Sequence, residues 1–150
     1  MCGIAGFCNP EINYESESVK WNRILEDMNR VQKRRGPDDE GIYVNKGCGL
    51  AHVRLSIIDL VTGHQPMIRK EQERECSIVF NGEIYNMKEL KEELREEGAR
   101  FETTSDTEVV LTGYMYHGPD YVKKLNGIFA MAIWDSGKES LYLFRDRLGV

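Results

Sequence analysis

Apolar residues repeat along this chain with two different periods, and the periods predict its helices and strands. Residues 19–34 space their apolar side chains by three and four positions, which is typical of an amphipathic helix. These side chains belong to Trp21, Ile24, Leu25, Met28 and Val31. Gly36 and Pro37 predict the end of this helix, because glycine offers a left-handed cap and proline cannot continue the helix.

Two further helices are predicted from start signals as well as from spacing. Asn86 with Glu89, and Ser105 with Glu108, have the pattern of capping boxes, in which the two side chains satisfy free N–H groups at the helix start. Glycines beyond each apolar period predict where these helices end, and they are Gly98 and Gly118.

Short apolar runs predict the strands. They cover residues 4–7, 42–44, 49–58, 77–80, 128–134 and 140–145, with a hairpin turn at 135–137. The run 49–58 is apolar on both sides, which suits a strand covered on both faces. Asn81-Gly82 should stop the strand before it, and the charged stretch 69–75 should be a solvated loop. Because strands and helices do not alternate regularly, their order favours an α+β fold of mixed sheets with helices packed outside.

The composition is that of an ordinary globular domain of 150 residues, and it mainly excludes functions. With 25 acidic and 20 basic residues the net charge is −5, so no nucleic-acid partner is expected, because such binding needs a basic face. The longest apolar runs are too short to cross a bilayer, so no membrane partner is expected. No signal peptide opens the chain, which predicts a cytoplasmic protein.

The four cysteines form no CxxC pair, and no histidine stands at metal-ligand spacing from them. Neither a structural zinc nor a secreted disulfide framework is therefore expected. Cys8, Cys48 and Cys76 are interpreted as small buried apolar residues. Cys2 differs, because removal of Met1 would leave it with a free α-amino group whose pKa lies near roughly 7.7–8.0. One residue would then hold both a thiol nucleophile and its base, whereas the alternative is a small residue near a strand start.

Other positions could carry chemistry, and each has a plain structural alternative. Asn81 and Gly82 could offer a side-chain amide and a backbone N–H to an oxyanion, or simply form a hairpin turn. Arg54 lies in an apolar strand, so it faces a carboxylate or a functional site, or else solvent at a strand edge. Asp106 begins a helix, where a carboxylate is stabilising in itself. His52 could act as a base, but such a histidine is more often a hydrogen-bonded core residue.

Six strings occur in one order over essentially the whole chain. They are residues 1–6, 35–38, 51–59, 81–86, 105–106 and 145–146, which read MCGIAG, RGPD, AHVRLSIID, NGEIYN, SD and RD. Together they resemble the glutaminase domain of the asparagine synthetases, which is a class II glutamine amidotransferase domain of the N-terminal nucleophile hydrolase superfamily. Amidotransferases of purine and glucosamine synthesis are similar at Cys2 and at the glycine turn, but they differ at the RGPD string.

The resemblance implies a four-layer αββα sandwich and the hydrolysis of glutamine to glutamate and ammonia. It implies that Cys2 is the nucleophile with its own amine as the base, and that Asn81 and Gly82 form the oxyanion hole. It also implies that Arg54 binds the α-carboxylate of glutamine and that Asp106 binds the α-ammonium group. Further residues that it implies for the pocket are Leu55, Ser56, Ile57, Ile58 and Glu83.

The same resemblance implies L-glutamine as the substrate and no cofactor or metal for this domain. In the family, ammonia passes to a C-terminal synthetase domain that uses ATP and magnesium to make asparagine. The Ser-Gly-Gly string of that domain does not occur here. The synthetase domain is therefore expected to be absent. The resemblance also implies that residues 1–150 are a glutaminase domain incomplete at its C-terminal end, because the family's domain continues beyond this point. The removal of Met1, the activity of the chain alone and the formation of a homodimer stay open.

Other functions fit some of the same residues. Related amidotransferases deliver ammonia to sugars or peptides, and only the segment beyond this domain distinguishes these acceptors. A catalytically silent glutamine-binding domain would keep the fold and would retain Met1. A redox protein that pairs Cys2 with Cys8 would leave the other strings unexplained.

Overall fold

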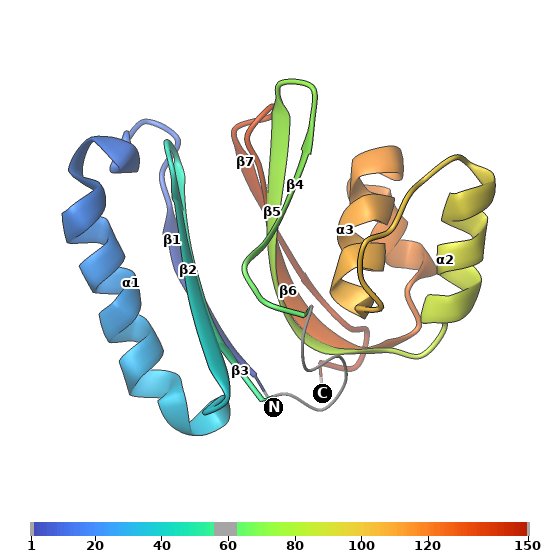
Figure 1. Ribbon diagram of the computed structural model, residues 1–150, viewed down its shortest axis with the longest axis horizontal. Helices are drawn as coiled ribbons and strands as arrows, with labels where there is room; N and C mark the ends of the chain where they lie inside the picture. The colour runs from blue at the N-terminus through green and yellow to red at the C-terminus, as the bar shows by residue number, and fades with distance from the viewer. Residues whose placement is uncertain (1, 56–62, 150) are drawn as a thin grey trace.

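The computed structural model describes residues 2–55 and 63–149 and arranges them in four layers. One helix, a three-stranded sheet, a four-stranded sheet and a pair of helices follow one another, so the two sheets face each other in the middle (Figure 1). The αββα sandwich that the resemblance implies is therefore confirmed.

The first sheet comes from the N-terminal third of the chain. Its strands are β1 (Gly3–Cys8), β2 (Asp39–Asn45) and β3 (Cys48–Arg54), which are antiparallel in the order β1-β3-β2. The outer face is covered by α1 (Ser18–Gln32), with short 3-10 helices η1 (Tyr14–Glu17) and η2 (Lys33–Arg35) at its two ends. All seven residues of β3 are buried, as its two-sided apolar pattern predicts.

The second sheet and its helices follow. Its strands are β4 (Met67–Glu71), β5 (Arg74–Ile84), β6 (Gly127–Asp135) and β7 (Ser140–Arg145), all antiparallel in the order β4-β5-β6-β7. Its outer face carries α2 (Met87–Glu96) and α3 (Asp106–His117), and η3 (Pro119–Lys124) leads back to β6.

A hydrophobic core lies on each face of the second sheet. One lies between the sheets and includes Leu50, Val79 and Trp134. The larger one lies between the second sheet and its helices and includes Ile78 and Phe80. Successive residues of β5 therefore belong to different cores, since side chains alternate between the two faces of a strand.

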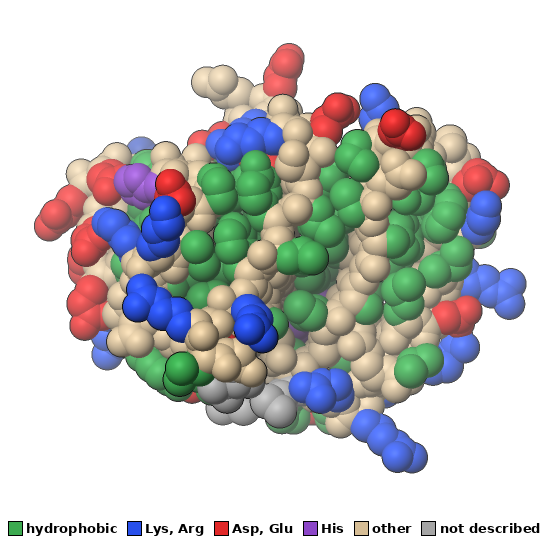
Figure 2. Space-filling model, turned by 180° about the vertical axis from the view of Figure 1, so that it is seen from behind, with side chains coloured by type: hydrophobic (Ala, Val, Ile, Leu, Met, Phe, Trp, Pro, Cys, Tyr) green, Lys and Arg blue, Asp and Glu red, His purple; other side chains and the backbone are tan. Residues whose placement is uncertain are grey.

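The surface seen from behind has hydrophobic side chains gathered over its middle and charged side chains mostly toward its margins (Figure 2). Leu143 on the edge strand β7 is 73% exposed and is one of the large apolar side chains on the surface. Within residues 2–55 and 63–149, no helix combines the length and the hydropathy that a membrane span requires.

Two predictions about the second sheet were wrong. The charged stretch 69–75 forms β4 and its turn into β5, where Lys70 and Glu75 pair across the strands at 2.6 Å. Asn81 and Gly82 do not stop β5, which continues to Ile84 alongside β6. Pairing with β6 over nine residue pairs outweighs the local preference of Asn-Gly for a turn.

The packed face of α1 differs from its predicted face at the C-terminal end. Val31 is 89% exposed, while Asn29 is buried and donates from Nδ2 to the carbonyl oxygen of Gly41 at 3.1 Å. Gly36 ends this region without a left-handed cap, because its φ is −150°. Glycine is required there for close approach, since a Cβ would lie 2.4 Å from the backbone nitrogen of Arg54.

The helix starts at Asn86 and Ser105 are confirmed, but their capping bonds differ from the predicted boxes. Asn86 makes no side-chain bond to its own helix and instead bonds the backbone just before β6. Ser105 caps α3 by accepting from the N–H of Thr107 at 3.1 Å. Glu108 accepts from the backbone N–H groups of residues 102 and 103, so it anchors the loop that leads into α3.

The buried thiols are Cys48 and Cys76, as predicted, whereas Cys8 is exposed. Cys8 ends the strand β1 directly opposite Cys48, at the end of the sheet where the chain turns away toward η1. Its position at the end of an edge strand explains why a cysteine here is not covered.

His52 lies in the contact between the two sheets and is a hydrogen-bonded core residue. It is fully buried, and its Nε2 is 3.2 Å from the carbonyl oxygen of Phe80 on β5. Donation from Nε2 leaves Nδ1 as an acceptor, and Nδ1 has no partner among the described residues. Burial lowers the pKa of His52 to about 4, although the bond to Phe80 opposes this shift. The side chain is therefore neutral near pH 7.

The lowered pKa of His52 predicts a specific loss of stability in acid. Below about pH 6.5 the unfolded chain binds a proton that the folded chain binds only below about pH 4. The free energy of unfolding should therefore fall between pH 6.5 and 4, with about 3 kcal/mol lost from this group once the pH lies below 4. Urea unfolding at a series of pH values measures this slope.

The matched control is His52→Gln, which keeps an N–H donor for the carbonyl oxygen of Phe80 but does not titrate. Its free energy of unfolding should fall less steeply over the same pH window. Equal slopes in the parent and in His52→Gln would contradict the prediction.

Candidate active site

Cys2 lies directly before β1, beside the end of β3. Its Sγ donates to the carbonyl oxygen of Leu55 at 3.8 Å, just after β3 ends. Nε of Arg35 donates to the carbonyl oxygen of Cys2 at 3.3 Å, which ties the start of the chain to η2. Figure 1 shows the N-terminus next to the end of β3, at one end of the contact between the sheets. The thiol is half-buried at this end of the contact between the sheets.

Alternation along the strands brings Arg54 and Asn81 to the space between the sheets. On β3, His52 faces β5, and Arg54 shares this face because it follows two residues later. On β5, Val79 faces the first sheet, and Asn81 follows it on the same face. Since His52 contacts Phe80, the residue before Asn81, both polar side chains lie near one end of the inter-sheet contact.

The backbone of β5 has an edge without a described partner strand beyond Ile78. The first residue of β4 is Met67, which pairs with Ile78, so the β4–β5 ladder stops there. In an antiparallel ladder, alternate residues bond to opposite neighbours. Phe80, Gly82 and Ile84 have the same parity, and their N–H groups point to the edge that β4 leaves uncovered.

Two of these three N–H groups are bound by side chains. Phe80 donates to Oε1 of Gln65 at 2.6 Å, and Ile84 donates to Oδ2 of Asp106 at 3.3 Å. No described side chain accepts from the N–H of Gly82 between them. This N–H is consequently a donor in the position where an oxyanion could be bound.

Gly82 also has a steric reason to be glycine. A Cβ there would lie 2.2 Å from the carbonyl oxygen of Ile128 and 2.6 Å from Cα of Phe129. The neighbouring strand β6 therefore approaches the backbone too closely for any side chain. The missing side chain also leaves the N–H unshielded by its own residue.

Asp106 is held at the first turn of α3, and its environment favours an added cation. Burial raises the pKa of its carboxyl group, and N–H groups of Ile84 and Thr107 partly counter this by stabilising the carboxylate. The nearby charge of Glu83 raises the pKa further. A cationic ligand would relieve this unfavourable environment, because it would compensate the buried negative charge.

Arg54 supplies a buried positive charge at the same end of the sandwich. Only 7% of its surface is exposed, and its carbonyl oxygen accepts from the N–H of Asp38 at 3.0 Å. The loop of Gly36, Pro37 and Asp38 packs against its backbone. Since a guanidinium stays charged in proteins, this position suits a carboxylate ligand.

The site residues predicted from the sequence have different outcomes. Cys2, Arg54 and Leu55 lie together, and Asn81-Gly82 lies across the inter-sheet contact from them. Glu83 is exposed at the end of β5. Ser56, Ile57 and Ile58 lie outside the described residues. The predicted pocket is therefore described except for this segment.

Sequence reasoning did not find Gln65, which is buried and bonds to β5 next to Asn81-Gly82. A single glutamine in a connecting segment has no pattern that predicts a role. Only the tertiary contact reveals it.

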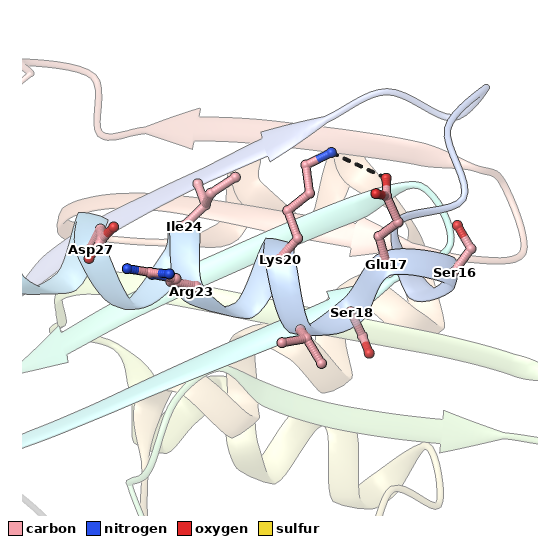
Figure 3. Close-up of a pocket in the computed structure, with 8 residues that line it drawn as sticks. Ser16, Glu17, Ser18, Lys20, Arg23, Ile24 and Asp27 are labelled. Carbon is pink, nitrogen blue, oxygen red and sulfur yellow. Dashed lines mark hydrogen bonds and ion pairs between the residues drawn. The ribbon is translucent and has the colours of Figure 1, made fainter.

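A surface depression of about 710 Å³ lies elsewhere, along η1 and the first turns of α1. It is lined by Ser16, Glu17, Ser18, Val19, Lys20, Arg23, Ile24 and Asp27. Figure 3 shows the labelled side chains along a single helical segment, with Lys20 and Ile24 pointing to one side of it and Ser18 to the other; Lys20 pairs with Glu17 at 3.2 Å. They do not converge on a common point and include no thiol or imidazole, so we assign no chemistry to this depression.

The chemistry of the site follows from its groups. A thiol, an amide side chain, a backbone N–H that no described side chain binds, a guanidinium and a carboxylate suit acyl transfer on a zwitterion with an amide. Among residues 2–55 and 63–149, no group of three or more His, Cys, Asp or Glu side chains could hold a metal ion.

Comparison with known proteins gives one family for the entire chain. A family model described as a glutamine amidotransferase domain matches residues 1–150. The chain is 39% identical over 150 residues to Asparagine synthetase [glutamine-hydrolyzing] 3 of Bacillus subtilis, covering all of this chain and 24% of that protein. It is 37% identical over 150 residues to Asparagine synthetase B [glutamine-hydrolyzing] of Escherichia coli, covering all of this chain and 26% of that protein.

A solved structure has a similar fold. It is the glutamine phosphoribosylpyrophosphate amidotransferase of B. subtilis in complex with ADP and GMP, with a TM-score of 0.58 and 26% identity. The match covers 71% of this chain and 24% of that chain. The chain thus spans about a quarter of the length of the proteins that it matches.

Proposed function

Because the chain belongs to the glutamine amidotransferase domain family, we propose that the Cys2 site hydrolyses the side-chain amide of L-glutamine to glutamate and ammonia. The observation that supports this most directly is the Gly82 N–H, which no described side chain binds, on the strand that His52 joins to the Cys2 sheet. Thioester chemistry requires a thiol and an oxyanion donor of this kind in one site.

Removal of Met1 is the first condition of the proposed mechanism, since it frees the α-amine of Cys2. This amine takes the thiol proton, directly or through a water, and the sulfur attacks the carbon of the substrate amide. The tetrahedral oxyanion collapses to a thioester, and the departing nitrogen takes the proton that the α-amine of Cys2 had accepted from the thiol and leaves as ammonia. Water then attacks the thioester, and the α-amine of Cys2 takes the proton of this water. The proton passes to the departing sulfur, so that glutamate is released and the thiol is restored.

The substrate is bound in this proposal by charges that match its two ends. Arg54 binds the α-carboxylate and Asp106 binds the α-ammonium, while Gly82 N–H and the Asn81 amide bind the oxyanion. The remaining contacts are proposed for the segment after Arg54 and for the end of β5, and they are made by Leu55, Ser56, Ile57, Ile58 and Glu83.

The ammonia acceptor is proposed to be the precursor of asparagine. This rests on relatives whose names are asparagine synthetases and of which this chain matches about a quarter. We propose that the rest of such a protein holds the synthetase domain, with ATP and magnesium bound there and not by residues 1–150, and that the protein acts in the cytoplasm. A sugar or peptide amidotransferase is the second candidate, because the structural neighbour from B. subtilis is an amidotransferase named for a different substrate, phosphoribosylpyrophosphate.

The state of Met1 should decide whether the chain is active. Protein without Met1 should release ammonia from L-glutamine, whereas protein that retains Met1 should not, because a peptide bond then occupies the Cys2 nitrogen. Intact-mass measurement of each sample together with an ammonia assay tests this. Ammonia release at equal rates by both forms would contradict the proposal.

Cys8 provides a matched control for this thiol because it is also accessible. Cys2→Ser should abolish ammonia release and Cys8→Ser should retain it. A glutamine-mimicking electrophile should label Cys2 and spare Cys8, Cys48 and Cys76. Even labelling of the four thiols would argue against a single activated cysteine, and a silent glutamine-binding domain would show binding without turnover.

Asn81→Ala should lower kcat by roughly 10²–10³, because it removes one of two oxyanion donors. The Michaelis constant should change much less, since the oxyanion exists only after attack. Asn13→Ala removes the side-chain cap of η1, far from the site, and serves as a control that should keep kcat. Turnover by Asn81→Ala within a few-fold of the parent would count against this oxyanion hole.

Asp106→Asn should raise the KM for glutamine by roughly 10- to 100-fold, because it removes one charge-assisted bond to the α-ammonium. The amide can still accept from the N–H of Ile84, so the first turn of α3 keeps its bond to β5. In the parent, KM should rise as the pH falls and Asp106 becomes protonated. Because burial raises the pKa of Asp106, this rise should begin at a higher pH than it would for an exposed aspartate. A pH-dependent KM that is the same in Asp106→Asn, or an unchanged KM, would refute the assignment.

A further inference from the structure

The uncovered edge of β5 is fastened to α3 at two points, on either side of Gly82. The N–H of Ile84 donates directly to Asp106, the first residue of α3. The N–H of Phe80 reaches the same helical turn through a side chain, because Gln65 accepts from Phe80 at 2.6 Å and donates from Nε2 to Oγ1 of Thr107 at 3.3 Å. The N–H of Gly82, the proposed oxyanion donor, therefore lies between two hydrogen-bonded connections to the first turn of α3.

Gln65 is built into this connection. It is only 5% exposed, and Thr107 is only 2% exposed, so neither side chain has solvent as an alternative partner. Both polar ends of the Gln65 amide are used, one on the strand and one on the helix. Removing the amide would leave buried donors and acceptors unpaired, which is costly in a protein interior.

The position of Gln65 follows from where β4 begins. Met67 opposite Ile78 is the last pair of the β4–β5 ladder; Gln65 comes two residues before Met67, and its side chain bonds to Phe80, two residues beyond Ile78. The side-chain amide of Gln65 accepts from the backbone N–H of Phe80. A longer β4 would otherwise accept from this N–H. The carbonyl oxygen of the same residue accepts from His52. Both backbone groups of Phe80 are therefore held by side chains.

We propose that Gln65 is a positioning residue that fixes the oxyanion donors of β5 relative to the ammonium-binding carboxylate of Asp106. The proposal rests on the proposed function. Gln65 touches neither substrate nor thiol in this proposal. It acts on Asn81 and Gly82 through the peptide of Phe80, and on Asp106 through Thr107.

The same connection sets the length of substrate that the site accepts. Gly82 and Ile84 are two residues apart on a strand, which is about 7 Å at about 3.3–3.4 Å per residue. This interval separates the oxyanion donor from the N–H that holds Asp106. In this proposal the substrate extends from the oxyanion donor, at its side-chain amide, to the carboxylate that Ile84 holds, at its α-ammonium group. A fixed interval should favour glutamine over asparagine, which is one methylene shorter.

The test compares Gln65→Met with Gln65→Glu in protein that lacks Met1. Gln65→Met keeps the approximate length but removes both bonds, and kcat for glutamine should fall roughly 10- to 100-fold, since a misplacement of about 1 Å can cost that much. Gln65→Glu keeps an acceptor for Phe80 and can accept from the Thr107 hydroxyl, so it should recover most of kcat. The preference for glutamine over asparagine should narrow in Gln65→Met and stay near the parent value in Gln65→Glu.

A double-mutant cycle separates positioning from general destabilisation. If Gln65 acts through the oxyanion hole, Gln65→Met should cost only a few-fold in an Asn81→Ala background, far less than in the parent. Asn29→Leu is the matched control, because Asn29 is also a buried amide that joins a helix to a strand, but in the first sheet. Its effect should be the same in both backgrounds. Additive effects of Gln65→Met and Asn81→Ala would overturn the proposal.

Amide hydrogen exchange gives a readout that does not need activity. In Gln65→Met the amides of Phe80, Asn81 and Glu83 should exchange at least tenfold faster relative to those of β3, because Phe80 loses its acceptor and the strand loses one anchor. Unchanged exchange there would overturn the positioning role even in an active enzyme. A parent protein without Met1 that releases no ammonia would instead overturn the proposed function, so the two failures are distinguishable.

Discussion

The candidate site depends on a requirement of the backbone: β5 is longer than its neighbour β4, and buried N–H groups need acceptors. Beyond Ile78, side chains do what a strand would otherwise do. Gln65 and Asp106 accept from Phe80 and Ile84, so α3 is attached to the strand along the edge that β4 leaves uncovered. A complete ladder would satisfy every donor and offer none to a ligand. The early end of β4 therefore produces both the connection to α3 and the donor that it surrounds.

The opposite end of β5 is anchored by a buried ionic group, which keeps the strand fixed along its length. Arg74 pairs with Asp135 at 2.6 Å, and the hydroxyl of Tyr114 donates to the same carboxylate at 2.9 Å. Burial alone would raise the pKa of Asp135, but hydrogen bonds from Arg74 and Tyr114 lower it overall, so the carboxylate stays charged. This group joins β5, β6 and α3 at the end away from Cys2. The site can then be rigid, since α3 and β5 are joined at both ends.

Much of the fold could be predicted from local patterns, and the failures have physical causes. The helices and the buried strand β3 follow from apolar spacing, which a single segment contains. The turn predicted at Asn81-Gly82 failed because pairing with β6 outweighs a two-residue preference. The outward Val31 shows that an apolar residue near the last turn of a helix is not always on its packed face. For the site, Cys2 and Asp106 were predicted from motifs, whereas the buried connector Gln65 was found only in the structure.

The sequence by itself determined the candidate site residues and their order along the chain. A cysteine after the initiator methionine, an arginine in an apolar strand and a carboxylate at a helix start are properties of single positions and short strings. The tertiary structure decided which backbone N–H of β5 no described side chain binds, and which side chains hold its neighbours. That decision depends on where one strand ends beside another and on contacts between residues 15 to 42 positions apart in the chain. No local pattern contains this information, because a hydrogen bond between distant segments exists only after the chain has packed.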